Sequence, residues 1–241
     1  MSNRLLPFRQ YDENDVINLF ANATSDTNPT TNGNGSAGVF VSVSAGNFSK
    51  DAITYVDRGA LGASYDHTKN QYPEVQLKVT AASAGAKAGE VIGVTLKQTL
   101  EQDENGEKLL YNPVKKDELQ AVLSGQAVPL ATRGVFTLTS DAVEGAFPST
   151  APSPGQACVM SPVNAGKVSG IAFDSLVGDF TEAGASFAPT GTTYDIGGGA
   201  TKIYYQSAHV LGTWLGTGTR SSVGPVTDVA AGGYAVLKLN L

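Results

Sequence analysis

Alternation of apolar and polar residues is the main pattern along this chain, and it predicts short β-strands. Every second position is apolar over residues 39–44 and 75–80, and Leu237, Leu239 and Leu241 share one face at the end of the sequence. A period of two is typical of a strand with one buried face. Further short strands are predicted at residues 91–96, 127–130, 135–139, 157–160, 167–173, 202–205, 209–215 and 234–241.

Two short helices are predicted between these strands. Asp12 and Asp15 suit a cap and an acidic first turn, and apolar residues at helical spacing follow as far as Phe20. The second helix is predicted over residues 115–123, opened by Asn112-Pro113 and closed by a C-cap at Gly125.

Two stretches of unusual composition divide the chain. Residues 22–38 hold no large apolar side chain, and residues 145–155 contain three prolines. Such segments are typical of linkers and semi-rigid connectors. The predicted units are an N-terminal arm and polar linker (1–38), a first β module (39–144), a Pro-rich connector (145–155) and a second β module (156–241).

The two modules share a short repeated sequence. Gly-Gln-Ala occurs at residues 125–127 and again at 155–157, each time followed by apolar residues. Three matched residues fit either an internal duplication or chance. A Gly- and Thr-rich stretch at residues 181–200 is long enough to form a projecting loop.

Composition agrees with a fold built from strands. The chain has 28 glycines in 241 residues, and only 16% of its residues are charged. Long helices favour Leu, Glu, Lys and Arg, whereas Gly-, Thr- and Val-rich chains form short strands joined by tight turns. The sequence therefore predicts an all-β fold.

Charge and cysteine content exclude several classes of protein. The net charge of −6 argues against a nucleic-acid binder, which needs cations to neutralise phosphates. Cys158 is the one cysteine, which excludes an intrachain disulfide and a cysteine-rich zinc module. Because no long apolar run and no secretory signal occur, we expect a soluble product made in a cytoplasm that does not bind a membrane.

Three motifs resemble ligand sites but lack the required context. Residues 33–38 match G-x-G-x-x-G, yet a polar linker precedes them and a strand follows, which favours a flexible loop over a dinucleotide site. Residues 164–168 depart from a P-loop, since Ser161 replaces its first Gly and Val168 its Ser or Thr. The acidic residues 103–107 could bind calcium weakly, but a solvated hairpin turn is favoured.

Candidate catalytic groups are few, because the chain has two histidines. His67 lies in a polar stretch, and His209 lies among apolar strand residues as a partly buried core residue. Neither has a second metal ligand at a recognisable spacing, and Cys158 is expected to be buried in a strand. We therefore predict no catalytic residue, no metal and no cofactor. The alternative of a β-rich hydrolase would require a serine and a carboxylate beside one histidine in a cleft.

The N-terminal arm carries the candidate partner-binding side chains. These residues are Leu5, Leu6, Phe8, Tyr11, Val16, Ile17, Leu19 and Phe20. A helix this short is marginal alone, so the arm either folds back on its own domain or docks on another chain. The absence of a recognisable active site favours docking.

The stretch from Asn3 to Phe20, with the polar linker and β modules behind it, resembles virion structural proteins of tailed bacteriophages, most of all capsid decoration (cement) proteins. A second region of likeness joins residues 103–110 to residues 124–129. The resemblance implies one or two small β-barrel or β-tulip modules behind an extended arm, attached to the outside of a capsid as trimers.

The expected function is therefore structural. The chain would bind the outer surface of a phage capsid and clamp neighbouring coat subunits, with the major capsid protein and its own copies as partners. It would be assembled in the host cytoplasm and remain on the virion. The alternative is a receptor- or glycan-binding tail or fibre component, which would use the 181–200 loop with Tyr194, Tyr204 and Trp214.

Overall fold

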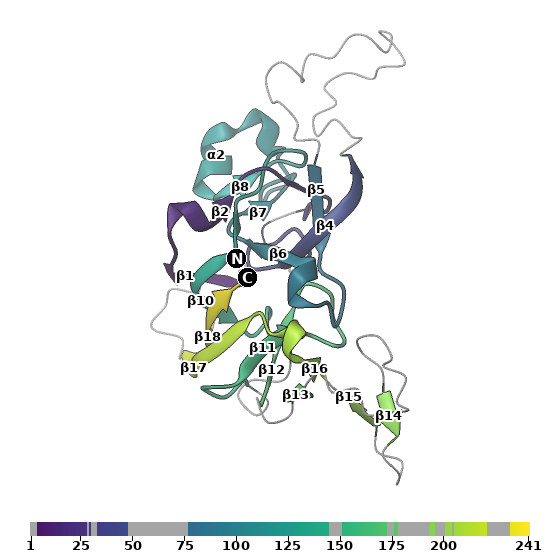
Figure 1. Cartoon of the computed structure of the whole chain (residues 1–241). Helices are drawn as coiled ribbons and strands as arrows, with labels where there is room; N and C mark the ends of the chain where they lie inside the picture. Colours follow the sequence, from purple (N-terminus) through teal and green to yellow (C-terminus); the bar gives the residue numbers. More distant parts are fainter. Residues whose placement is uncertain are drawn as a thin grey trace.

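Two six-stranded sheets form the body of the protein. The structure is a computed structural model, and it describes residues 4–27, 29, 33–47, 77–144, 151–172, 176–177, 193–195, 201–203, 205–220 and 232–241. The predicted all-β fold is confirmed, because strands dominate and the curled sheets form a half-barrel (Figure 1).

The first sheet runs in the order β1-β10-β18-β17-β11-β12. Its strands are β1 (Leu5–Gln10), β10 (Arg133–Thr139), β11 (Ala157–Met160), β12 (Val168–Ile171), β17 (Gly212–Arg220) and β18 (Gly232–Asn240). The pairing is antiparallel throughout, and Phe136 lies opposite Leu237 at the centre. β1 is an edge strand, a position that tolerates its Pro7 because the missing N–H is not needed there.

The second sheet runs in the order β2-β9-β6-β4-β5-β3. Its strands are β2 (Val16–Ile17), β3 (Ala21–Asn22), β4 (Phe40–Asn47), β5 (Leu77–Ala81), β6 (Val91–Thr95) and β9 (Leu130–Ala131). Three two-stranded pairs accompany it: β7 (Gln98–Thr99) with β8 (Ala121–Val122), β13 (Leu176–Val177) with β16 (Tyr205–Gln206), and β14 (Thr193–Asp195) with β15 (Thr201–Ile203).

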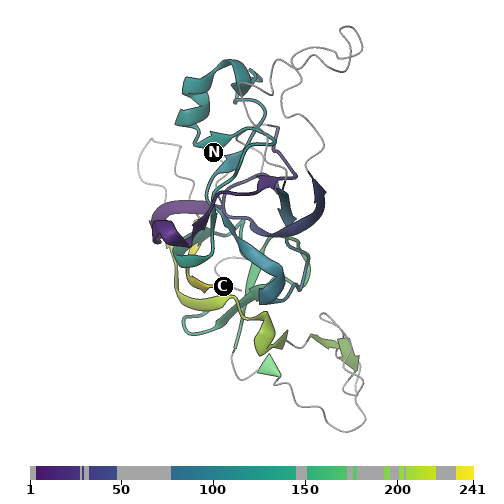
Figure 2. The same ribbon diagram turned by 45° about the horizontal axis from the view of Figure 1, so that its top comes forward.

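Helical segments are short. They are η1 (Glu13–Asp15), η2 (Ala88–Glu90), η3 (Leu109–Tyr111), α2 (Pro113–Glu118) and η5 (Ser207–His209). In both views of the ribbon, α2 lies at one end of the molecule and the segment of β16 and η5 lies toward the other (Figures 1 and 2).

One hydrophobic core joins the two sheets. Phe40 and Val94 enter it from the second sheet, and Phe136, Trp214 and Leu237 enter it from the first. All five side chains are fully buried. The alternation along β10 and β18 places every second residue in this core, as the period-two pattern predicts.

The strand pairing does not follow the predicted division into modules. β10 belongs to the predicted first module (39–144), yet it pairs along its whole length with β18 of the predicted second module (156–241). Residues of both modules also share the main core. Composition breaks identify loops, whereas sheet partners are chosen by contacts between residues far apart in the sequence.

The predicted arm and linker (1–38) also belong to the folded body. β1 pairs with β10, and Leu5 lies in the core with 5% of its surface exposed. The helix expected after Asp12 is a single 3₁₀ turn, capped by Asp12 as predicted, and Val16 leads into strand β2 instead. Linker residue Asn22 is buried as well.

The second predicted helix is shorter than expected. Asn112 caps α2 by accepting a hydrogen bond from the Lys115 backbone N–H at 3.2 Å, and Pro113 is its first residue, as predicted. The helix ends at Glu118 because Gln120 takes a positive φ of 49°, after which the chain enters β8. Gly125 therefore lies in a later turn and does not cap this helix.

Candidate functional site

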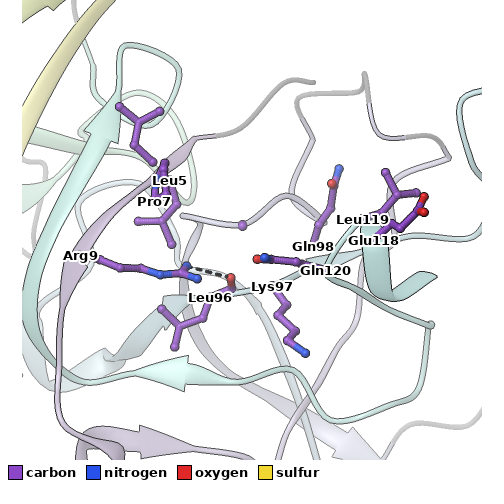
Figure 3. A pocket seen from close by; sticks show the side chains of 11 residues that line it. Leu5, Pro7, Arg9, Leu96, Lys97, Gln98, Glu118, Leu119 and Gln120 are labelled. Atoms are coloured by element: carbon purple, nitrogen blue, oxygen red, sulfur yellow. Dashed lines mark hydrogen bonds between the residues drawn. The ribbon is translucent and has the colours of Figure 1, made fainter. Parts of the chain in front are cut away.

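The candidate site is a pocket between strand β1, residues 96–98 and the end of α2 (Figure 3). Its volume is about 270 Å³. Leu5 and Leu6 form part of its apolar wall, and Leu119 forms another part. β1 places its residues here because it is the edge strand of the first sheet, while residues 96–97 connect β6 to β7 and Gln98 begins β7.

Polar side chains complete the lining of this pocket. Arg9 donates from Nη1 to the carbonyl oxygen of Leu96 at 3.4 Å, and Lys97 is exposed (Figure 3). Gln98 is only 6% exposed, and its amide nitrogen has no hydrogen-bond partner among the described residues. Gln120 lines the opposite side and has a positive φ, which a residue with a Cβ rarely adopts.

A buried charge cluster fixes the loop that resembles a dinucleotide motif. Asp26 accepts hydrogen bonds from the Gly35 N–H at 3.2 Å and from the Ser36 hydroxyl at 2.8 Å. Arg4 is buried nearby, and burial lowers the pKa of its guanidinium while the charges of Asp26 and Asp141 oppose that shift.

The glycines of residues 33–38 allow this loop to pack closely against Asp26. A side chain at Gly33 would collide with the Asp26 carboxylate, and a Cβ at Gly35 would lie 2.5 Å from the Asp26 backbone nitrogen. The segment is thus a loop, as predicted, but it is a packed loop and not a flexible linker. Since the Gly35 N–H already binds Asp26 and a strand follows, the loop does not form a phosphate cradle.

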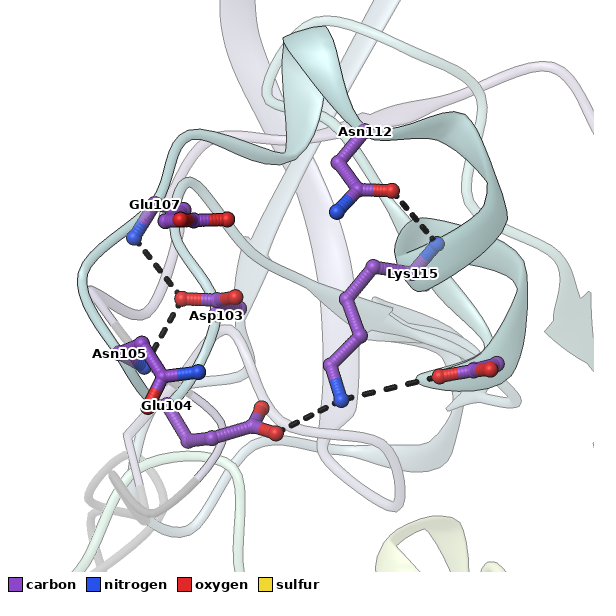
Figure 4. Close-up of polar contacts among 7 residues, drawn as sticks. Asp103, Glu104, Asn105, Glu107, Asn112 and Lys115 are labelled. Atoms are coloured by element: carbon purple, nitrogen blue, oxygen red, sulfur yellow. Dashed lines mark hydrogen bonds and ion pairs between the residues drawn. The ribbon is translucent and has the colours of Figure 1, made fainter.

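The acidic residues 103–107 form the predicted turn (Figure 4). Buried Asp103 accepts hydrogen bonds at 2.8 Å from the backbone N–H groups of Asn105 and Glu107. Glu104 binds Lys115 of α2 at 2.7 Å, and this hydrogen bond lowers the pKa of Glu104 and raises that of Lys115. These carboxylates stabilise the turn itself. Within the described ranges, no three His, Cys, Asp or Glu side chains gather in a way that could hold a metal ion.

The remaining candidate residues are mostly buried. Cys158 is fully buried in β11, as predicted, and burial raises the pKa of its thiol well above the ordinary value. His209 is 2% exposed, so it is more deeply buried than the sequence suggests. Trp214 is also fully buried and donates from its indole nitrogen to the Ser169 carbonyl at 3.2 Å.

These placements bear on the two alternative functions. Because Trp214 lies in the core, the prediction that it contacts a glycan is wrong. Tyr204 and His67 lie outside the described residues, as does most of the 181–200 loop, and Tyr194 belongs to β14.

The residues predicted to bind a partner differ in their exposure: some are buried and others are exposed. Leu5 and Leu6, which were predicted to contact a partner, are buried within their own chain. Val16, Ile17 and Phe20 pack at the margins of the core clusters. Phe8 is 72% exposed, Leu19 is 62% exposed and Tyr11 is partly exposed.

The pocket itself could not be identified from the sequence. Arg9, Gln98 and Gln120 are far apart in the chain and belong to no motif. The one available signal was the Pro7 in an apolar strand, which indicates an edge.

Comparison with protein-family models, with curated proteins and with solved structures finds no match for this chain. None of the helices in the described part of the chain has the length and apolar character needed to span a membrane.

Proposed function

We propose that this chain is a non-enzymatic structural protein of a phage virion, which binds the outer surface of the capsid as a trimer and clamps neighbouring coat subunits. The support is the resemblance of residues 3–20 to decoration proteins, together with the exposure of Phe8 and Leu19 in that same stretch. The observation that carries most weight is Phe8, a large apolar side chain standing 72% exposed on an edge strand.

The geometry changes how the arm would act. Because Leu5 is anchored in the core, the arm stays folded and presents Phe8 from a fixed position, so binding requires little additional ordering of the chain. Burying one large apolar side chain contributes about 2 kcal/mol. Repetition of that contact over a symmetric shell then multiplies a modest affinity.

A co-sedimentation experiment tests this proposal. Shells assembled from the coat protein of the same virus would be mixed with the wild-type chain or with a Phe8→Ser, Leu19→Ser double variant. We expect the double variant to bind at least tenfold more weakly, since two exposed apolar contacts of about 1 kcal/mol or more each are lost.

The matched control is Val163→Ser. Val163 is 70% exposed in the turn between β11 and β12, outside the N-terminal stretch, so its loss should leave shell binding unchanged. Equal binding by the double variant and the wild type would refute the role assigned to Phe8 and Leu19. No binding by the wild-type chain would refute the capsid function.

A further inference from the structure

We propose that the pocket between β1 and the end of α2 binds a carboxylate group carried on a short aliphatic stem. This inference goes beyond the proposed function, since it concerns a site apart from the exposed side chains of Phe8 and Leu19.

The first argument is the amide of Gln98. This side chain is 6% exposed, lines the pocket, and has a nitrogen without a hydrogen-bond partner among the described residues. An amide nitrogen carries two N–H donors, and leaving a buried donor unpaired destabilises a fold. A ligand oxygen in the pocket would satisfy this donor, so the ligand must offer a hydrogen-bond acceptor.

The second argument is the charge of the lining. The lining includes two basic residues, Arg9 and Lys97, and one acidic residue, Glu118, so its net charge is positive although the whole chain has a net charge of −6. The bond from Arg9 to the Leu96 carbonyl is long, at 3.4 Å, and its guanidinium has further N–H donors. An acceptor with a negative charge therefore fits better than a neutral one.

The third argument is the apolar wall. Leu5 and Leu6 line the pocket from β1, and Leu119 lines it from the end of α2. A volume of about 270 Å³ admits a few carbon atoms beside a carboxylate group. The ligand is thus an aliphatic carboxylate rather than a free inorganic anion.

Gln120 lines the pocket just beyond the end of α2. Gln120 is the one residue other than glycine with a positive φ in the described part of the chain. This φ ends the helix, since a residue in the left-handed region just after the C-cap commonly terminates a helix. Figure 3 shows the Gln120 amide and the Arg9 guanidinium pointing toward one another across the pocket.

Calorimetric titration of the isolated full chain with pentanoate, pentanamide and pentylamine tests the chemistry. We expect saturable binding of pentanoate and at least tenfold weaker binding of the other two compounds. N-acetyl-leucine and N-acetyl-glutamate α-amide then distinguish a chain-terminal carboxylate from a side-chain carboxylate. Equal affinity for pentanoate and pentanamide, or no saturable binding of any carboxylate, would overturn the proposal.

The variant Gln98→Leu separates ligand binding from structure. It should weaken pentanoate binding about fivefold, the effect of one hydrogen bond, while leaving the melting temperature equal or higher because an unpaired buried amide is removed. Gln10→Leu, at an exposed glutamine on β1 that does not line the pocket, is the matched control. Unchanged binding by Gln98→Leu would contradict the assignment.

A second variant changes an exposed residue and leaves the packing of the core unchanged. Lys97 is exposed, so Lys97→Glu should fold normally and should weaken pentanoate binding at least tenfold through charge reversal. Retained affinity in this variant would count against a carboxylate ligand. All these measurements use the chain without capsid shells, so their failure is distinguishable from failure of the decoration function.

Discussion

At the residue scale, the most consequential side chain is Asp26, an acidic residue within a stretch whose composition is typical of a linker. Its two carboxylate oxygens bind the Gly35 N–H and the Ser36 hydroxyl, and its charge opposes the cost of burying Arg4. A single buried carboxylate thus joins the start of β1 to the loop that precedes β4.

We predict that Asp26→Asn lowers the free energy of unfolding by about 3 kcal/mol, because buried Arg4 loses one of the two carboxylate charges that offset its burial and only Asp141 remains. Urea denaturation followed by circular dichroism measures this effect. Asp117→Asn, at a side chain that is 81% exposed, should change stability by less than about 0.5 kcal/mol. The double variant Arg4→Met, Asp26→Asn should recover part of the loss. An effect of Asp26→Asn no larger than the control would contradict this account.

At the element scale, three turns share one design. In the turns ending at Gln126, Gln156 and Glu90, the last side chain accepts a hydrogen bond from the backbone N–H three residues earlier. The backbone N–H of the last residue in turn donates a hydrogen bond to the carbonyl oxygen of the residue three positions earlier. The repeated Gly-Gln-Ala sequence therefore has a local cause. The turns at Glu90 and Gln156 lead directly into β6 and β11, and the turn at Gln126 leads into an isolated bridge at Ala127, so an internal duplication is not needed to explain the repeat.

The glycines of these turns allow a matched test of backbone strain. Gly155 has a φ of +82° and Gly89 does not lie in the left-handed region, while a Cβ at either position would meet nothing within 4 Å. We predict that Gly155→Ala destabilises the protein by about 1 kcal/mol, whereas Gly89→Ala is neutral or slightly stabilising. Thermal unfolding of the two variants checks this difference. Similar effects at both positions would show that φ does not decide the outcome.

Local sequence patterns predicted helices and strands well where neighbouring residues alone determine the structure. The strand at residues 157–160 matches β11 at both ends, and the cap at Asn112 is confirmed. The extent of α2 was wrong because the helix ends at Glu118 and Gln120 takes a positive φ, which helical spacing does not reveal. The pocket could not be predicted, since its lining residues on β1 and at the end of α2 are about a hundred positions apart in the sequence and come together only in the tertiary structure.

At the scale of the whole molecule, the chain forms its sheets from both of its halves. The N-terminal strand β1 and the C-terminal strand β18 both pair with β10, one on each side, so the first and last parts of the sequence lie in the same half of one sheet (Figure 1). The predicted boundary at residues 145–155 separates neither the sheets nor the core. A fragment ending before residue 145 would leave Phe136 and Leu138 without their partners on β18.

This shared core predicts cooperative unfolding. Trp214 is the one tryptophan of the chain and reports on the core from the second half, while amide exchange at Val94 reports from the first half. Because both residues pack in the same cluster, we expect tryptophan fluorescence and Val94 protection to be lost at the same urea concentration. The separately expressed fragment of residues 1–144 should lack dispersed amide resonances, since its β10 would present an unpaired edge and an exposed apolar face. Two distinct midpoints, or an independently folded fragment, would instead support two separate domains and would require the core contacts between Phe136 and Leu237 to be energetically minor.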